Sequence, residues 1–450
     1  MLEDPVRRTV SELPVYTTKT EGHSAPGFQT WADLARRRHG RAVRIVLPNT
    51  SELILLADPR HNDVFRRNPD AFRKEVEQLP SSAAVIALLL KDSVTSTRDG
   101  ALWQERRSQS IPLMRIGQLG FSSALKFATE QLLEDLTSRE GRDPLWEICA
   151  MWAARGVSKP MLGNNIEDRD TLEVVDGLLK AMYDLVLETE ENRDIETMRA
   201  DPRVVRLRDM TTALVDRSIS SLTPGDDSMV ATFAATTGLG LDREQLKNML
   251  VPIVSGNLVA SIHTTALTLM WALFQLASRP DLVEKVATEA KQTNYTDWHI
   301  NDLPQALAIV RETLRITPIV PFIERITNEP VDFGDVVVPK DTTVVFSPWL
   351  VHRDPDVWPD PLIFDPDRFS SGQKIDFTTY FPFGLGPRGC MGMNFALPQL
   401  TYAVSRICSH MTLEVASDCK PSAWKPIQRI LLETRAPVHV QSRRRAVEPA

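Results

Sequence analysis

Apolar positions in the middle of this chain recur at helical spacing, whereas short β-rich runs occur before and after this region. From about residue 122 to residue 222 the apolar residues return at the spacing of one helix face between many charged residues, which predicts a succession of amphipathic helices. Pro144, Pro160 and Pro202 are expected to mark breaks between them. Helical spacing also follows Gly392, so another helix is expected to begin there.

The β-rich runs are short and are bounded by turn residues. Residues 42–46 and 53–56 flank Pro48-Asn49-Thr50, a pattern that predicts a β-hairpin. Asp58-Pro59 then supplies an N-cap and a proline for the start of a helix. Further short strands are expected at 331–338, 342–346, 411–415 and 430–434. The tail, residues 441–450, has three arginines and no apolar periodicity, so it is expected to be frayed.

One expected helix is apolar on nearly all of its sides. It begins at Asp242 and continues to just before Pro280, and Pro252 either kinks it or marks the start of its regular part. Beyond Pro252 its all-round apolar character is typical of a helix buried through the centre of a domain. The run from Ala260 to Thr265 places several polar side chains inside this apolar helix.

Composition and charge narrow the class of protein. Of the 450 residues 42% are hydrophobic, enough for a large core, and the net charge of −7 argues against nucleic acid as a partner. The four cysteines have no paired spacing, which favours a reducing compartment without disulfides. The longest apolar run, 83–90, is too short to span a bilayer, and no apolar run follows the first residues. We therefore expect a soluble, cytoplasmic protein with no membrane contact.

The strongest chemical signal is the glycine-rich stretch from Phe383 to Gly392, which contains Cys390 and, two residues earlier, Arg388. A buried thiolate needs a bound cation or backbone N–H groups directed at the sulfur. Glycines let the backbone pass close to a flat ligand, and an arginine fork suits an anionic group. The expected helix after Gly392 would favour negative charge at its start. The alternative is a glycine and proline loop that holds an inert buried cysteine.

This stretch resembles the haem-binding loop of the cytochrome P-450 family, Phe-x-x-Gly-x-Arg-x-Cys-x-Gly, and every fixed position is matched. The resemblance covers roughly residues 40–440. It implies haem b as cofactor, Cys390 as the axial ligand of its iron, and Phe383, Arg388 and Gly392 as parts of the haem-binding loop. The implied fold is one mainly α-helical domain over 1–450 with a smaller β region and a long distal helix over the haem. About 1–35 would be an N-terminal extension.

Two further haem contacts follow from the same resemblance. Trp103 and Arg107 lie four apart on an expected helix, where the family uses Trp-x-x-x-Arg to hold haem propionates. Arg325 is implied to bind a propionate as well. The alternative for Trp103 and Arg107 is that the tryptophan belongs to the core and the arginine to the surface, without a role at a haem.

On the distal helix, Thr264 matches the family threonine that hydrogen-bonds the oxygen substrate or its water. Ala260, one turn earlier, would lie on the same helix face, toward the haem. Two residues depart from the family's Ala-Gly-x-Asp/Glu-Thr-Thr: Ser261 replaces the glycine and His263 replaces the acid. Histidine can relay protons near neutral pH. The sequence leaves three roles open for His263, which are a proton relay, a substrate contact, or packing alone.

Other family positions are assigned to structure or to the substrate pocket. Glu312 and Arg315 share a helix face, and Arg368 would complete a buried Glu-Arg-Arg network that supports the proximal side. By resemblance Val320, Phe322 and Ile427 border the substrate. Residues 79–96 would be a loop over the substrate or, equally well, a short core helix.

The implied function is that of a haem-thiolate monooxygenase of the soluble bacterial type, which oxidises a small, largely apolar organic molecule of a natural-product pathway. The chain has no flavin or iron–sulfur motif, so electrons would come from a ferredoxin or flavodoxin and its reductase. A monomer is expected. The departures at the distal helix suggest a second reading, oxidative C–C or C–N coupling or peroxide-supported oxidation. A haem gas sensor or electron carrier is the non-enzyme alternative.

Overall fold

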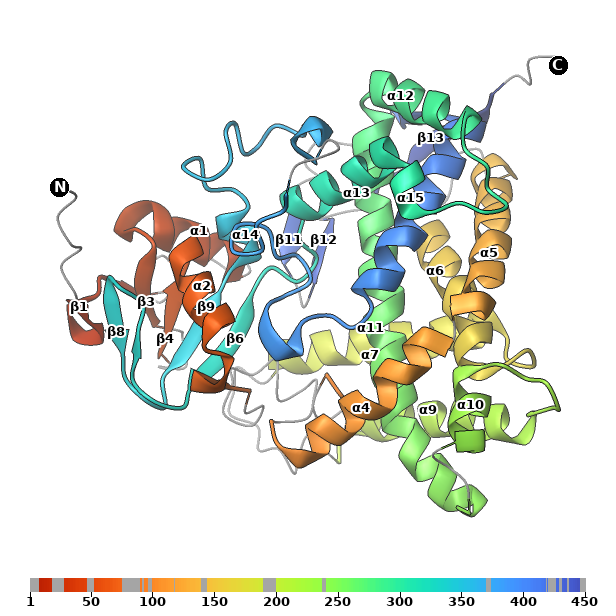
Figure 1. The fold of residues 1–450 in the computed structure, drawn as a ribbon, viewed down its shortest axis with the longest axis horizontal. Coiled ribbons are helices and arrows are strands. Elements are labelled where there is room, and N and C mark those ends of the chain that lie inside the picture. The colour runs from red at the N-terminus through yellow and green to blue at the C-terminus, as the bar shows by residue number, and fades with distance from the viewer. Residues whose placement is uncertain are drawn as a thin grey trace.

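The structure, a computed structural model, separates into a large helical part and a smaller β region (Figure 1). The β region contains the first strands of the chain and the strands of residues 323–346, so segments distant in sequence lie side by side there. The expected mainly α-helical architecture with a smaller β region is confirmed. The structure describes residues 8–17, 28–46, 52–74, 90, 93–95, 99–116, 118–138, 144–188, 200–236, 240–369, 374–417, 419, 426–428, 431–434 and 437–445.

The helices follow the apolar periodicity of the sequence. Some of their N-termini have side-chain caps, as where the Asp58 side chain accepts from the Arg60 N–H at the start of α2. The helices are α1 (Phe28–His39), α2 (Pro59–Arg67), α4 (Ala101–Ile116), α5 (Gln118–Ser138), α6 (Leu145–Leu162), α7 (Asp168–Glu188), α9 (Pro202–Ser220), α10 (Met229–Thr236), α11 (Arg243–Ala277), α12 (Pro280–Lys291), α13 (Pro304–Ile316), α14 (Pro348–Val351) and α15 (Met393–His410).

The long helix α11 runs through the centre of the helical part (Figure 1). It begins where the sequence predicts, with a capping box between Asp242 and Gln245. Pro252 lies inside the helix, which continues on both sides of it. By length and composition α11 is apolar enough to cross a membrane, but 72% of its most apolar window is buried within the fold. Its all-round apolar surface therefore matches a helix in the protein core.

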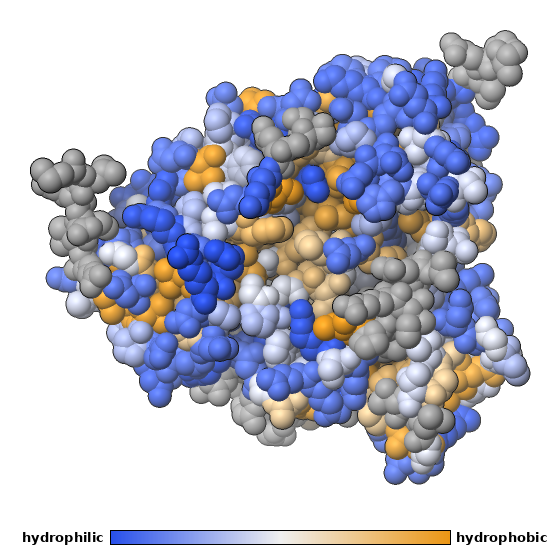
Figure 2. Space-filling model, in the orientation of Figure 1, coloured by the Kyte–Doolittle hydropathy of each residue, from blue (hydrophilic) through white to orange (hydrophobic). Residues whose placement is uncertain are grey.

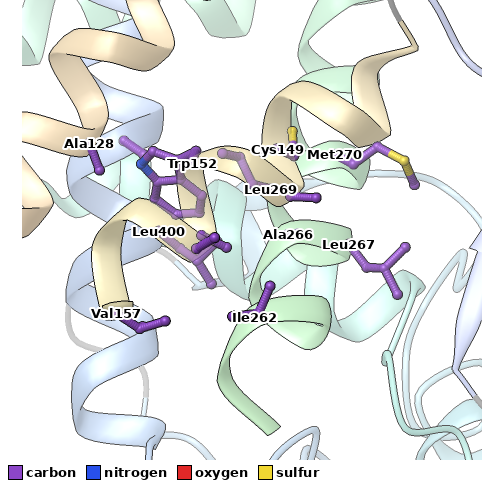
Figure 3. Close-up of a cluster of buried hydrophobic side chains, with 14 of the residues drawn as sticks. Ala128, Cys149, Trp152, Val157, Ile262, Ala266, Leu267, Leu269, Met270 and Leu400 are labelled. Atoms are coloured by element: carbon purple, nitrogen blue, oxygen red, sulfur yellow. The ribbon is translucent and has the colours of Figure 1, made fainter. Parts of the chain in front are cut away.

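The main core forms where α5, α6, α11 and α15 meet, and Figure 3 shows part of it. The Trp152 ring of α6 lies among side chains of its own and neighbouring helices, including Ala128, Ile262 and Leu400. Its indole N–H donates to the Thr129 hydroxyl at 3.2 Å, so the ring is buried without an orphaned donor. This packing holds α11 and α15, which together position the site, in a fixed relation.

The sheets join residues from the start and the later part of the chain. The largest has six strands in the order β2-β3-β4-β9-β6-β5, and β3 and β4 form the predicted antiparallel hairpin. The strands are β1 (Arg8–Thr9), β2 (Val15–Thr17), β3 (Ala42–Val46), β4 (Glu52–Leu56), β5 (Phe72–Arg73), β6 (Ile323–Thr327), β7 (Val331–Asp332), β8 (Val336–Val338), β9 (Thr343–Phe346), β10 (Met411–Val415), β11 (Pro426–Gln428), β12 (Leu432–Thr434) and β13 (Val440–Arg444).

Three expectations need correction. Within the expected N-terminal extension β1 pairs with β8 and β2 pairs with β3, so these residues belong to the sheets. The expected frayed tail begins inside β13, which pairs antiparallel with β10. β1 and β2 have only two and three residues, and β13 has one apolar residue, Val440, so none of them shows an apolar alternation of its own. Pro160 lies inside α6, which ends two residues later at Leu162, so it does not separate two helices.

Candidate active site

The loop before α15 turns tightly around Cys390. Gly384 and Gly386 have φ angles of 77° and 70°, in the left-handed region that glycine adopts readily. The Cys390 N–H donates to the Phe383 carbonyl at 2.8 Å, which closes the loop on itself. Gly392 is the N-cap of α15, so the sulfur lies just before the start of an 18-residue helix, as the sequence predicts.

The surroundings of the Cys390 sulfur act on its pKa in opposite directions. Desolvation raises the pKa of the thiol, although the residue as a whole is exposed. The backbone N–H groups of Gly392 and Met393 and the Arg107 guanidinium lower the pKa, because they stabilise the thiolate. Desolvation prevails, so the thiolate needs a further positive charge beside it, such as a metal ion, to be the stable form.

Arginines from two distant segments meet at Trp103 of α4. The Arg388 guanidinium lies 4.5 Å from the Trp103 ring centre and the Arg107 guanidinium lies 5.6 Å from it. Arg107 also approaches the Gly389 carbonyl, with both terminal nitrogens at 3.4 Å. Arg388 donates from Nε to Asp99 at 2.5 Å. The structure thus brings the predicted Trp103, Arg107 and Arg388 together beside the cysteine loop.

Two more cations lie against this group. Burial and the nearby Arg388 lower the pKa of Arg325 to about 10, and burial and Arg325 lower the pKa of Lys74 to about 7. We call Lys74, Arg107, Arg325 and Arg388 the cation cluster. Its carboxylate neighbours are Asp99 and Glu324, and burial raises the pKa of Glu324 to about 7. Lys74 and Glu324 are only partly charged at neutral pH, but three arginines against Asp99 still leave an excess of positive charge that an anionic ligand would neutralise.

These residues fit a haem group. Cys390 provides one sulfur donor on a glycine-rich turn, and the cation cluster provides partners for two carboxylates. A cavity of about 210 Å³ opens beside Trp103, Arg325 and Arg388, and neither Cys390 nor α11 lines it. His352 is another candidate for an iron ligand, but it is fully buried, and burial and Arg315 lower its pKa to about 3. Its Nε2 already accepts a hydrogen bond from the Phe381 N–H at 3.0 Å. The cation cluster could therefore hold the haem propionates, and Cys390 could hold the iron.

Arg325→Ala is expected to weaken haem binding roughly 10- to 100-fold, because it removes a charge-assisted partner of a carboxylate. Transfer of haem to apomyoglobin, followed by absorbance, measures the change. Arg66→Ala is the matched control, since Arg66 pairs with Asp63 on the exposed side of α2. Equal haem loss in both variants would contradict a propionate role for Arg325.

Beyond Pro252 most residues of α11 are buried, and the residues around Thr264 form an accessible part of this stretch. Ala260 is exposed, and Ser261 and Thr264 are half-buried, while the residues before and after them are mostly buried. The Thr264 hydroxyl donates to the Ala260 carbonyl at 2.6 Å, and Ser261 donates to the Leu258 carbonyl at 3.3 Å. Both hydroxyl oxygens keep the capacity to accept a hydrogen bond. Ala260 and Thr264 therefore share an accessible face, as predicted.

His263 lies apart from this accessible face. It is only 7% exposed, and its Nε2 lies 3.1 Å from Asp176 Oδ1 on α7. Its ring packs on Trp146 of α6, with ring centres 4.9 Å apart. The position that holds an acid in the family is therefore tied to two neighbouring helices in this protein.

The predicted Glu-Arg-Arg group also comes together. Arg315 and Glu312 are fully buried and share two contacts of 2.7 Å, Nε to Oε2 and Nη2 to Oε1. Arg368 Nε lies 3.6 Å from Glu312 Oε1, a longer contact. Arg315 Nη1 donates to the His352 carbonyl at 2.7 Å. The group thus ties α13 to the segment that leads to the cysteine loop.

The predicted substrate-pocket residues do not gather in the described structure. Val320 is 43% exposed, and Phe322 packs against the sheet core that includes Trp349. Ile427 lies in β11, where its backbone pairs with Glu433, and its side chain lies outside the described part. Most of 79–96 also lies outside the described residues. Their role at the substrate stays a prediction.

The structure adds residues that the sequence did not suggest. Lys74, Asp99 and Glu324 belong to the charged surroundings of the cation cluster, and Asp176 and Trp146 hold His263. No local motif marks them, because each acts through a partner on another element. Figure 2 shows apolar residues gathered in a hollow near the centre of one face, with hydrophilic residues over most of the rest.

Comparisons with known proteins identify the family of this chain. The sequence model of the cytochrome P450 family matches residues 32–437, so the chain belongs to the cytochrome P450 family. Among curated relatives, cytochrome P450 3A30 of Fundulus heteroclitus is 33% identical over 201 residues, which cover 43% of this chain and 40% of the relative. A lithocholate 6-beta-hydroxylase of Mesocricetus auratus is 32% identical over 186 residues, 40% of this chain and 37% of the relative. These alignments therefore span about two fifths of the relatives' length.

A solved zebrafish cytochrome P450, determined with abiraterone, superposes with a TM-score of 0.74 at 18% identity. The match covers 93% of this chain and 100% of the other, and it shows the shared fold. The family is one of haem proteins, in accord with the fit of Cys390 and the cation cluster to haem. The relatives named here are from a fish and a mammal, and a soluble bacterial type stays a prediction.

Proposed function

We propose that this protein is a haem-dependent monooxygenase that oxidises a small, largely apolar organic molecule with dioxygen. The observation that carries the proposal is the Cys390 loop, where a sulfur donor meets two backbone N–H groups beside the cation cluster. The name of one relative records a hydroxylation, which is a monooxygenase reaction.

The residues of the chain have distinct tasks in this reaction. When bound, haem b supplies the activation of dioxygen at an iron held by sulfur. The N–H groups of Gly392 and Met393 and the Arg107 charge favour the thiolate form of Cys390, and the metal ion of the bound haem would supply the remaining stabilisation. The Thr264 hydroxyl, which donates to the Ala260 carbonyl, can accept a hydrogen bond from a water and so hold that water at the accessible face of α11. The exposed Ala260 leaves space on that face.

The source of electrons is proposed to be external. The sequence has no flavin or iron–sulfur motif, so a ferredoxin or flavodoxin with its reductase is the proposed partner. We also propose that the protein is a cytoplasmic monomer that acts in a natural-product pathway. It is proposed to bind neither membrane nor nucleic acid, and the negative net charge supports the absence of nucleic-acid binding.

Two spectra test the proposed function. The reduced protein with carbon monoxide is expected to show its Soret band at the red-displaced position that thiolate ligation gives. Candidate small molecules are then screened for the change in spin state that follows displacement of water from the site. A haem-loaded protein with an imidazole-type spectrum would contradict the proposal, and a thiolate spectrum with no ligand among organic molecules would favour a gas sensor.

Thr264→Ala is expected to raise, about 2- to 10-fold, the ratio of hydrogen peroxide to water formed from the electrons consumed. The reason is the loss of one hydrogen bond, worth about 0.5–1.5 kcal/mol, at the place where protons reach oxygen. Peroxide release per NADPH consumed measures the effect. Thr268→Ala is the control, because Thr268 makes the same kind of bond, to the Thr264 carbonyl, but is buried. An unchanged ratio in Thr264→Ala would exclude this role.

A second candidate reaction is oxidative coupling or peroxide-supported oxidation. The observation that favours it is the histidine at the family's acid position, which lies away from the accessible face of α11. Product formation from hydrogen peroxide without reductase tests it. The monooxygenase proposal instead expects product only with dioxygen and electrons.

A further inference from the structure

One buried amide on α11 has an unused hydrogen-bond donor. Asn257 is only 4% exposed, and its Nδ2 is buried and has no hydrogen-bond partner among the residues that the structure describes. A buried donor without a partner costs free energy, and such groups are rare in folded proteins. A leucine has the same branching and would occupy this position without that cost. The amide therefore calls for a partner that the protein does not provide.

Asn257 lies on the helix face that contains Thr264. Residues three, four and seven positions apart share a face of an α-helix, so Asn257, Ala260 and Thr264 follow one another along α11. At 1.5 Å per residue, Asn257 is about 10 Å from Thr264 along the helix axis. Ala260 is exposed and lies between them. The accessible face of α11 therefore has a hydroxyl at one end and the unused amide donor at the other.

A distant segment closes this face beside Asn257. Ser93 packs on Gly256, since a Cβ at position 256 would lie 2.6 Å from Ser93 Cβ and would have to displace the segment. The Ser93 hydroxyl lies 2.8 Å from the Thr95 hydroxyl. Lys74 Nζ donates to the Thr95 carbonyl at 2.6 Å, which ties the segment to the cation cluster. The face is thus open at Ala260 and ends at a polar wall.

We propose that Asn257 is a specificity-determining residue whose amide donates a hydrogen bond to an oxygen acceptor of the substrate. This inference rests on the proposed function and names the class of substrate. The molecule is apolar along most of its length and has a carbonyl or similar oxygen about 10 Å from the carbon that is oxidised beside Thr264. Its apolar part lies over Ala260, and its oxygen supplies the missing partner of the Asn257 amide.

A pair of matched ligands tests this hydrogen bond. The haem-loaded protein is titrated with 2-undecanone and with undecane, which differ only at the carbonyl, and the change in spin state measures each Kd. Asn257→Leu and Asn257→Ala are each expected to weaken binding of the ketone relative to undecane about 3- to 10-fold, the worth of one hydrogen bond. Comparison of two ligands in two proteins isolates this contact from the difference in their solubility.

The matched control is Ser255→Ala. Ser255 is buried on the same helix, and its hydroxyl donates to the Pro252 carbonyl. This variant also removes a buried polar group from α11, but Ser255 does not lie on the face of Thr264. The ratio of the two Kd values is expected to stay unchanged in it.

Thermal unfolding of the haem-loaded protein without ligand separates recognition from a structural role. Because the Asn257 donor has no partner in the protein, Asn257→Leu is expected to raise the melting temperature by about 1–3 °C. An amide that supports the fold would give the opposite result, a variant that melts at a lower temperature. A recognition residue thus gives a variant that is more stable and less selective.

Three results would overturn the inference. They are an unchanged ratio of the two Kd values in Asn257→Leu and Asn257→Ala, a lower melting temperature of Asn257→Leu, and the absence of a spin-state change with either ligand in the unmodified protein. The proposed function fails on a different observation, namely the absence of a thiolate Soret band in the unmodified protein with carbon monoxide, so the two failures are distinguishable.

Discussion

Cys390→Ser is expected to lower monooxygenase activity by more than about 100-fold. Loss of a residue that only supports a metal ligand costs up to about 100-fold, and loss of the ligand itself should cost more. A serine hydroxyl at this position stays protonated and cannot supply the electron density of a thiolate. The two N–H groups of Gly392 and Met393 that favour a charged sulfur would face a neutral oxygen. The variant is therefore expected to lose the red-displaced Soret band with carbon monoxide while it keeps its fold.

The matched control for this prediction is Cys408→Ser. Cys408 lies in α15, the helix that begins at the same loop, but it is fully buried and burial raises the pKa of its thiol to about 12. It cannot act as a thiolate there, so the control is expected to retain the thiolate spectrum. A Cys390→Ser protein that keeps the same Soret position would show that another residue holds the iron, and the site described above would be wrong.

Glu312→Gln is expected to destabilise the protein by about 3–5 kcal/mol, because it leaves the buried Arg315 charge without its partner. Both side chains are fully buried, and the pair shares two contacts of 2.7 Å. Burial raises the pKa of the Glu312 carboxyl, and Arg315 acts against this shift. Urea denaturation of the haem-loaded protein measures the change in the free energy of unfolding, with haem absorbance as a second probe.

Two further variants make this result specific. Glu284→Gln removes the exposed partner of Arg445 and is expected to cost less than about 1 kcal/mol, as surface ion pairs do. Glu312→Gln combined with Arg315→Met is expected to recover much of the loss, since the uncompensated charge is then gone. No recovery in the double variant would mean that the arginine matters mainly through its bonds to the carbonyls of His352 and Pro361.

Local patterns in the sequence were sufficient for most elements of the fold. The hairpin of β3 and β4, the start of α11 at Asp242 and the helix after Gly392 follow from alternation, caps and periodicity, which act between near neighbours. The strand pairs of β1 with β8 and β10 with β13 could not be predicted in this way. A two- or five-residue strand gains its stability from a partner that may be hundreds of positions away, and nothing in its own residues names that partner.

The sequence by itself determined the chemistry of the centre: a cysteine in a glycine turn, an arginine beside it, and a threonine in an apolar helix. Each of these depends on residues within about ten positions of one another, so a linear pattern records them. The tertiary structure alone decided which charges surround that centre. The cation cluster and the contact of His263 with Asp176 join side chains from separate elements, because electrostatic partners are chosen by distance in space and by burial, not by position along the chain.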